Sequence, residues 1–110
     1  MQHICRTKEA PFLRTLAIIN GKWKFRILYE LACETTLRYG ELKRNLAPIT
    51  HKMLSDQLKD LAADDMIVRH IYPEVLPRVD YSLSPKGLTF LPIMVALCDW
   101  GKEHTAPSKT

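Results

Sequence analysis

Residues 39–61 contain the pattern that most restricts how this chain can fold. A short helical segment, a tight turn containing Pro48 and a longer helical segment beginning after Thr50 follow one another directly. Residues 67–83 then predict a strand, a proline-bounded loop and a second strand. Two helices joined by a turn and followed by a two-stranded ribbon with a basic tip form the outline of a winged helix-turn-helix. The predicted fold class is therefore α+β, mostly α.

The length and the net charge of the chain limit the number of domains and the kind of partner that we expect. We expect residues 1–110 to form a single winged-helix DNA-binding domain, because domains commonly have about 100–150 residues. Polar composition predicts flexible tails at 1–9 and 103–110. A net charge of +4 and a pI near 9.1 favour an anionic partner such as double-stranded DNA, although charge alone is weak evidence. No signal peptide is evident, and the longest apolar run, 90–98, is far shorter than the ~20 residues of a membrane span. We therefore expect a cytoplasmic protein with no membrane partner.

The longer helix of the pair has one apolar face and one polar face. Leu54, Leu58 and Leu61 follow helical spacing and are predicted to face the core. Taken alone, the helix could be an ordinary solvated amphipathic helix. The preceding helix and turn and the following ribbon favour the alternative, in which its first turns enter a DNA major groove. The predicted base or phosphate contacts of this helix, including its N-cap residue, are Thr50, His51, Lys52, Ser55 and Lys59, while Asp56 shares the same polar face.

Basic residues elsewhere complete the predicted DNA-binding surface. Lys43 and Arg44 on the preceding helix would lie along the phosphate backbone. Lys22 and Lys24 would meet phosphate at a helix start, and Arg78 at the edge of the ribbon would reach a minor groove. For each, the alternative is an ordinary surface cation. The residues are Lys22, Lys24, Arg38, Lys43, Arg44 and Arg78.

Two further helices are expected at the ends of the chain. The first begins at Pro11, and the last opens at Ser84-Pro85, with a bend at Pro92. The last helix is apolar nearly all round over 90–98, and a domain this small has little interior to cover it. One side is therefore expected to pack on its own domain and the other on a second copy. The predicted homodimer interface consists of Leu13, Leu16, Phe90, Leu91, Met94, Leu97, Cys98 and Trp100.

Motifs for catalysis or cofactor binding are absent from the sequence. It has no nucleophile elbow or glycine-rich phosphate loop, its four histidines are scattered, and its three cysteines form no C-x-x-C pair. We therefore expect neither an enzyme, nor a cofactor, nor a metal site. Cys33 and Cys98 are predicted to be buried, whereas Cys5 lies in a basic stretch and is a possible redox-sensing thiol. A small thiol oxidoreductase built on Cys5 is the enzyme alternative.

From about Pro11 to Gly101 the chain resembles the HxlR-type winged-helix transcriptional regulators, relatives of the MarR-like repressors. The segments that carry the resemblance are Gly21-Lys22-Trp23-Lys24, Gly40-Glu41-Leu42-Lys43, Ile49-Thr50-His51-Lys52-Met53-Leu54, Leu58-Lys59-Asp60-Leu61, Tyr72-Pro73-Glu74-Val75, Pro77-Arg78-Val79-Asp80-Tyr81-Ser82-Leu83 and Trp100-Gly101.

The resemblance implies a homodimer, held together by its first and last helices, on a palindromic operator. It also implies control of a nearby gene, by repression or activation, in response to a stress or a small molecule whose identity the sequence leaves open. Sensing members of the family carry Cys-Pro before the first helix; here Pro11 matches that proline and Ala10 occupies the cysteine position. The alternative function is a winged-helix protein–protein interaction module that does not bind DNA.

Overall fold

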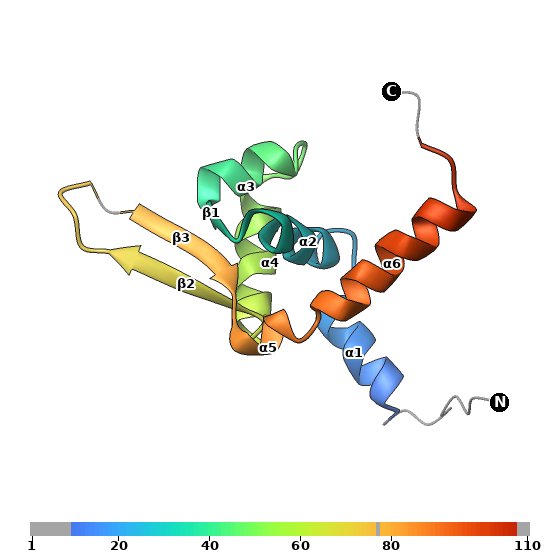
Figure 1. The fold of residues 1–110 in the computed structure, drawn as a ribbon. Helices are drawn as coiled ribbons and strands as arrows, with labels where there is room; N and C mark the ends of the chain where they lie inside the picture. Colours follow the sequence, from blue (N-terminus) through green and yellow to red (C-terminus); the bar gives the residue numbers. More distant parts are fainter. Residues whose placement is uncertain (1–9, 77, 108–110) are drawn as a thin grey trace.

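The computed structural model describes residues 10–76 and 78–107, which form six helices and three strands in those ranges (Figure 1). In chain order they are α1 (Pro11–Ile19), α2 (Lys24–Glu34), β1 (Thr36–Arg38), α3 (Tyr39–Asn45), α4 (His51–Ala63), β2 (Ile67–Tyr72), β3 (Arg78–Leu83), α5 (Pro85–Leu88) and α6 (Leu91–His104).

The strands form one antiparallel sheet in the order β1-β3-β2, and the β2–β3 hairpin extends away from the helices as a wing (Figure 1). Tyr72 pairs with Arg78 at the outer end of the hairpin. The winged helix-turn-helix fold predicted from the sequence is confirmed. The basic wing tip is not: Glu74 is the charged residue of the loop, Val75 is fully exposed, and the cation Arg78 stands at the base of the loop.

The core lies where α2, α3 and α4 cover the sheet. Leu54, Leu58 and Leu61 of α4 are at most 3% exposed, as the helical spacing predicted. Thr50 caps this helix, because its Oγ1 accepts a hydrogen bond from the Met53 backbone N–H at 3.1 Å. The cap and the apolar stripe are local signals, and both predictions are confirmed.

At the start of α3, Gly40 would be an acceptable N-cap by residue type, but it does not hold that position. The cap residue is Arg38, and its backbone N–H donates to Glu41 Oε1 at 2.8 Å. Glu41 is the third helical residue, from which a carboxylate can reach back to the N-cap backbone. Gly40 has no side chain for this task and lies inside the first turn.

A buried serine joins the end of α4 to the start of α5. Ser84 Oγ accepts from the Gly87 backbone N–H at 2.9 Å and donates to the Asp65 carbonyl oxygen. The chain reverses there because Asp65 takes a positive φ of 59° after Asp64, the C-cap at which α4 ends. A Cβ at Gly87 would lie 2.1 Å from the Met66 carbonyl oxygen, so a side chain there would force the backbone apart.

The last predicted helix is two helices, α5 and α6, separated at Thr89 and Phe90. Pro92 therefore lies in the first turn of α6, where proline starts a helix, and the expected bend is wrong. The predicted flexible tail is also wrong for residues 103 and 104, which are helical. Among the described residues, α6 meets the core at its start: Phe90 just before the helix and Met94 in its first turn are buried, and the Phe90 ring lies 5.5 Å from that of Phe25.

The molecule is elongated, 58 × 39 × 24 Å, with α1 and α6 on the side opposite the wing (Figure 1). Cys33 and Cys98 are exposed, so the prediction that both are buried is wrong for this chain by itself. The reason is that α6 leaves the core after its first turn and takes Cys98 with it. Cys5 lies outside the described residues. No helix in the described ranges is long and apolar enough to cross a membrane.

We predict that Ser84→Ala lowers the free energy of unfolding by about 1–3 kcal/mol, because it removes a helix cap and leaves buried backbone groups without a partner. Chemical denaturation measures the change. Ser82→Ala is the control, since Ser82 is half-buried on the adjacent strand and its hydroxyl forms no hydrogen bond in the described structure. Equal losses in the two variants would contradict the role given to Ser84.

Candidate nucleic-acid interface

The first turn of α4 is held in place by the hydroxyl group of Tyr39, at the start of α3. The Tyr39 hydroxyl oxygen lies 2.7 Å from His51 Nδ1, 3.1 Å from Ser55 Oγ and 3.2 Å from the His51 carbonyl oxygen. The Tyr39 and His51 rings also stack, with centroids 5.3 Å apart and planes 19° from parallel. Tyr39 thus fixes the angle at which the beginning of α4 leaves the turn.

The outward face of α4 carries the side chains that the sequence analysis assigned to DNA. Lys52 is 85% exposed at its side chain and pairs with Asp56 at 3.1 Å, one helical turn away. An exposed pair of this kind contributes under ~1 kcal/mol, so Lys52 can exchange Asp56 for another anion at little cost. Lys59 is exposed and has no ion pair with any described residue. Met53, 45% exposed, adds an apolar side chain beside Lys52.

A buried carboxylate lies between the two arginines that flank the sheet. Asp80 is 7% exposed, although strict strand alternation with Tyr81 and Leu83 would put it on the solvent face. Its Oδ1 lies 3.6 Å from Arg78 Nε and 3.9 Å from Arg38 Nε. Arg78 also lies over the Tyr72 ring at 4.1 Å. Arg78 is therefore held at the base of the wing, and the more exposed guanidinium of this group is that of Arg38.

The cations of α3 lie beside Arg38. Arg38, Gly40, Glu41 and Arg44 line an open hollow of about 380 Å³. Arg44 is exposed and Lys43 is half-buried. Glu41 keeps its negative charge when it accepts the Arg38 backbone N–H, so the two guanidinium groups give the lining of the hollow an excess of one positive charge.

The two lysines near the start of α2 are engaged within the chain. Lys24 is 12% exposed at its side chain and pairs with Asp60 of α4 at 3.3 Å. The Lys22 ammonium lies 4.8 Å from the centroid of the Trp23 ring. The Lys24–Asp60 pair ties α2 to α4, and both contacts leave less of the lysine charge for an outside partner.

Three side chains at this surface were missed by the sequence analysis: Tyr39, Met53 and Arg69. The partners of Tyr39 lie 12 and 16 residues along the chain, so no local spacing marks it. Met53 follows from the helical wheel, on which it stands beside Asp56 and Asp60 at the edge of the polar face. Arg69 of β2 is exposed and faces α4 across a cavity, which only the folded chain brings together.

The described cysteines gather around Tyr29. The pKa of Tyr29 is raised, first by a side-chain hydrogen bond with Cys33 and then by electrostatic interaction with Cys33 and Cys98. The thiols of α2 and α6 therefore lie near the same phenol. No group of three or more metal-binding side chains occurs among the described residues.

Comparison with known proteins assigns this arrangement to a family. Residues 18–109 match the HxlR-like helix-turn-helix family. The chain belongs to this family. It is 51% identical over 107 residues to the HTH-type transcriptional regulator YdzF of Bacillus subtilis, across 97% of this chain and 98% of YdzF. It is 50% identical over 97 residues to an HTH-type transcriptional regulator of Halalkalibacterium halodurans, across 88% of this chain and 86% of that protein.

Solved structures of similar chains share the fold of this HxlR-like protein. A MarR-family regulator from Porphyromonas gingivalis W83 superposes with a TM-score of 0.82 and 38% identity, across 93% of this chain and 99% of that one. The redox regulator HypR in its oxidised form gives a TM-score of 0.80 and 36% identity, across 89% and 100%. This HxlR-like chain is a helix-turn-helix transcriptional regulator, and its relatives are regulators rather than enzymes.

We predict that Tyr39→Phe destabilises the start of α4. Loss of the hydroxyl group removes its contacts with His51 and Ser55 and lowers the free energy of unfolding by about 0.5–1.5 kcal/mol. Amide hydrogen exchange should accelerate most over residues 51–55. Tyr72→Phe is the control, because the Tyr72 hydroxyl forms no hydrogen bond with a described residue. Unchanged exchange over 51–55 would show that Tyr39 does not hold the helix.

Proposed function

We propose that this regulator binds a palindromic operator as a homodimer, with α4 in the major groove, and that a stress or small-molecule signal controls this binding. The observation that carries the proposal is the anchoring of α4. Its first turn is held by Tyr39, and Lys52 and Lys59 point outward from it. A pre-positioned helix with exposed cations loses little conformational freedom when it meets a groove.

The side chains divide by the part of DNA that they would contact. Lys52 and Met53 on the exposed first turn are suited to base edges, a lysine to guanine and an apolar side chain to a thymine methyl group. Thr50, His51 and Ser55 are engaged in the cap and the Tyr39 contacts, so their role is to hold the helix as well as to meet the duplex. The proposed phosphate contacts are Arg38, Lys43, Arg44 and Lys59, with Arg78 at the wing and Lys22 as peripheral members. Lys24 is left out of this set because of its pairing with Asp60.

The dimer half of the proposal is supported by apolar surface on α1 and α6. No side chain of α1 is buried, and Phe12 is 60% exposed. On α6, Leu97 is 53% and Trp100 60% exposed. Apolar surface gathered on two neighbouring helices of a small protein marks an interaction site. The proposed interface comprises Phe12, Leu13, Leu16, Leu91, Ile93, Val95, Leu97, Cys98 and Trp100.

Two members of the predicted interface have another role in the structure. Phe90 is 8% exposed and Met94 is 3% exposed, and both belong to the core of the protomer. Their burial holds the start of α6 on the core of its own protomer. The outer face of α6 would then pack against a second copy. Closed two-fold symmetry would then present two α4 helices to successive turns of DNA, about 34 Å apart, which is why a palindrome is proposed.

The signal that would control binding is a stress or a small molecule. HypR, one of the solved relatives, is a redox regulator. In this chain Ala10, at the family's cysteine position, is 1% exposed and has no thiol. A role of Cys5 in redox sensing stays a prediction.

The DNA-binding prediction concerns salt and two lysines. With about 6–10 phosphate contacts per dimer, affinity for a selected operator should fall roughly 10³- to 10⁵-fold between 50 and 200 mM salt. Lys52→Ala should relax base preference, and Lys43→Ala should weaken binding to all sequences alike. Fluorescence anisotropy measures both effects, with Lys102→Ala on α6 as the charge-matched control. An operator affinity that does not depend on salt would contradict the proposal and favour a module that binds protein.

The dimer prediction concerns Leu97. Leu97→Asp places a charge in the proposed apolar interface and should yield a monomer with lost operator affinity. Light scattering at micromolar concentration measures the mass, and circular dichroism establishes that the variant is folded. Val75→Asp at the fully exposed wing tip is the matched control and should remain dimeric. A monomeric unmodified protein under the same conditions would contradict the prediction.

A further inference from the structure

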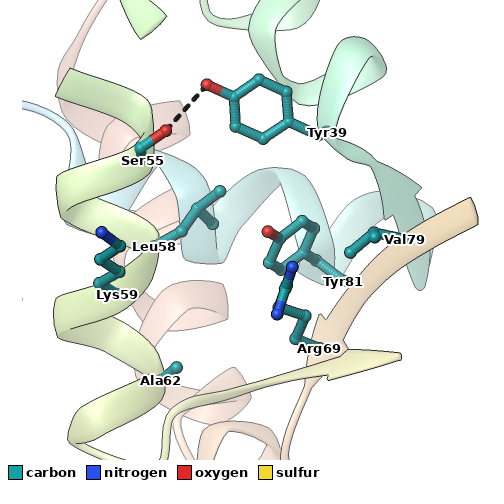
Figure 2. A pocket seen from close by; sticks show the side chains of 8 residues that line it. All are labelled: Tyr39, Ser55, Leu58, Lys59, Ala62, Arg69, Val79 and Tyr81. Carbon is teal, nitrogen blue, oxygen red and sulfur yellow. Dashed lines mark hydrogen bonds between the residues drawn. The ribbon is translucent and has the colours of Figure 1, made fainter. Parts of the chain in front are cut away.

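The two faces of the sheet carry different kinds of side chain. Figure 2 shows Val79 and Tyr81 of β3 on the face that looks toward α4. Successive side chains of a strand point to opposite faces, so Arg78 and Asp80 lie on the other face. The register of the sheet puts Arg38 of β1 directly beside Asp80. The Asp80 carboxylate therefore has one arginine on its own strand and another on the neighbouring strand.

This carboxylate meets both guanidinium groups at their Nε atoms. Asp80 Oδ1 lies 3.6 Å from Arg78 Nε and 3.9 Å from Arg38 Nε, and the Asp80 side chain is 10% exposed against 33% and 59% for the two arginines. The terminal Nη groups of both arginines form no hydrogen bond with a described residue. Each guanidinium group thus meets the carboxylate on one side and keeps its terminal donors for another acceptor.

Stability alone does not account for this cluster. A buried carboxylate loses its hydration, and ion pairs compensate for that loss only when they are close and the remaining lone pairs are hydrogen-bonded. Charged hydrogen bonds measure about 2.7–2.9 Å, shorter than either Asp80 contact. Within the described part of the chain, Asp80 Oδ1 and Arg78 Nε are buried without a hydrogen-bond partner. The main effect of the carboxylate is therefore on where the two guanidinium groups are held.

We propose that Asp80 is a positioning residue for operator recognition, an inference that rests on the proposed function. It holds Arg38 beside the hollow of α3 and Arg78 at the base of the wing, and the terminal groups of both arginines meet the duplex. A side chain that is already held loses less conformational freedom on binding. The same carboxylate repels phosphates that approach from its own side, so the two cations favour one bound arrangement over others.

The first test compares a selected operator with a random duplex of the same length by fluorescence anisotropy. Asp80→Asn removes the charge with little change of shape and frees both arginines, so operator affinity should fall at least about fivefold. Affinity for the random duplex depends on the number of cations and should stay the same or rise. Asp80→Glu keeps the charge and should retain the operator preference within about threefold. Equal changes on the two duplexes in Asp80→Asn would overturn the proposal.

Glu103→Gln on α6 is the matched control. It removes the same charge from an exposed position, on the helix that lies opposite the wing (Figure 1). Both affinities should stay within about twofold of those of the unmodified protein, because salt screens an exposed charge far from the duplex. A loss of operator preference as large as that in Asp80→Asn would show that net charge is responsible, and would refute a role for the position of the arginines.

A second test uses the full-length protein without DNA and follows the arginine Nε–Hε resonances. In the unmodified protein, Arg38 Hε should exchange with water about two- to fivefold more slowly than Arg44 Hε. Arg44 is exposed and has no ion pair with a described residue. Asp80→Asn should remove the difference, with circular dichroism to establish that the variant is folded. Equal exchange of the two arginines in the unmodified protein would refute the proposal even if the variant does not fold.

The results separate this inference from the proposed function. An operator preference that is unchanged in folded Asp80→Asn would overturn the inference and leave the proposed function standing. A protein that protects Arg38 Hε but binds no duplex would overturn the proposed function, and with it the part of Asp80 in recognition, while the contact between Asp80 and the arginines would stand.

Discussion

Leu54, Leu58 and Leu61 form one face of α4, and their burial against α2 and the sheet sets the orientation of the whole helix. Burying one face turns the opposite face outward, because residues one helical turn apart point the same way. The charges that this chain presents to an outside partner therefore depend on an apolar contact behind them. Tyr39 adds the remaining constraint, since it holds the first turn of α4 to the start of α3.

The two ends of the molecule differ in the side chains that they expose. At one end α4 and the wing carry cations around a cavity, and at the other α1 and α6 expose apolar side chains (Figure 1). Burial explains this division: the core reaches only the first turn of α6, through Phe90 and Met94. A chain of 110 residues buries a limited share of its surface, and a second copy is the economical cover for the rest. Dimerisation and DNA recognition would thus use separate surfaces joined by α2.

Local signals in the sequence were sufficient for most elements of the fold. The Thr50 cap and the leucine stripe of α4 are set by neighbours a few residues away. The segments 67–72 and 78–83 pair as two strands, as expected. The sequence failed where distant residues meet. Asp80 is buried between two arginines, Tyr39 reaches α4 from another helix, and Cys98 is exposed because α6 leaves the core. The bend expected at Pro92 is absent for a simpler reason. The predicted helix is broken before Leu91, so Pro92 lies at the beginning of α6 and not in the middle of a longer helix.

The most direct test of this account is to map a duplex onto the isotopically labelled protein by amide chemical shifts, with an operator selected from a random library. The account predicts shifts on α3, on the outward face of α4 and on β2 and β3, with one set of resonances for the two symmetric protomers. It predicts no new shifts along α6, because that helix would already be covered in the free dimer. Shifts that fall on α1 and α6 and spare α4 would contradict it.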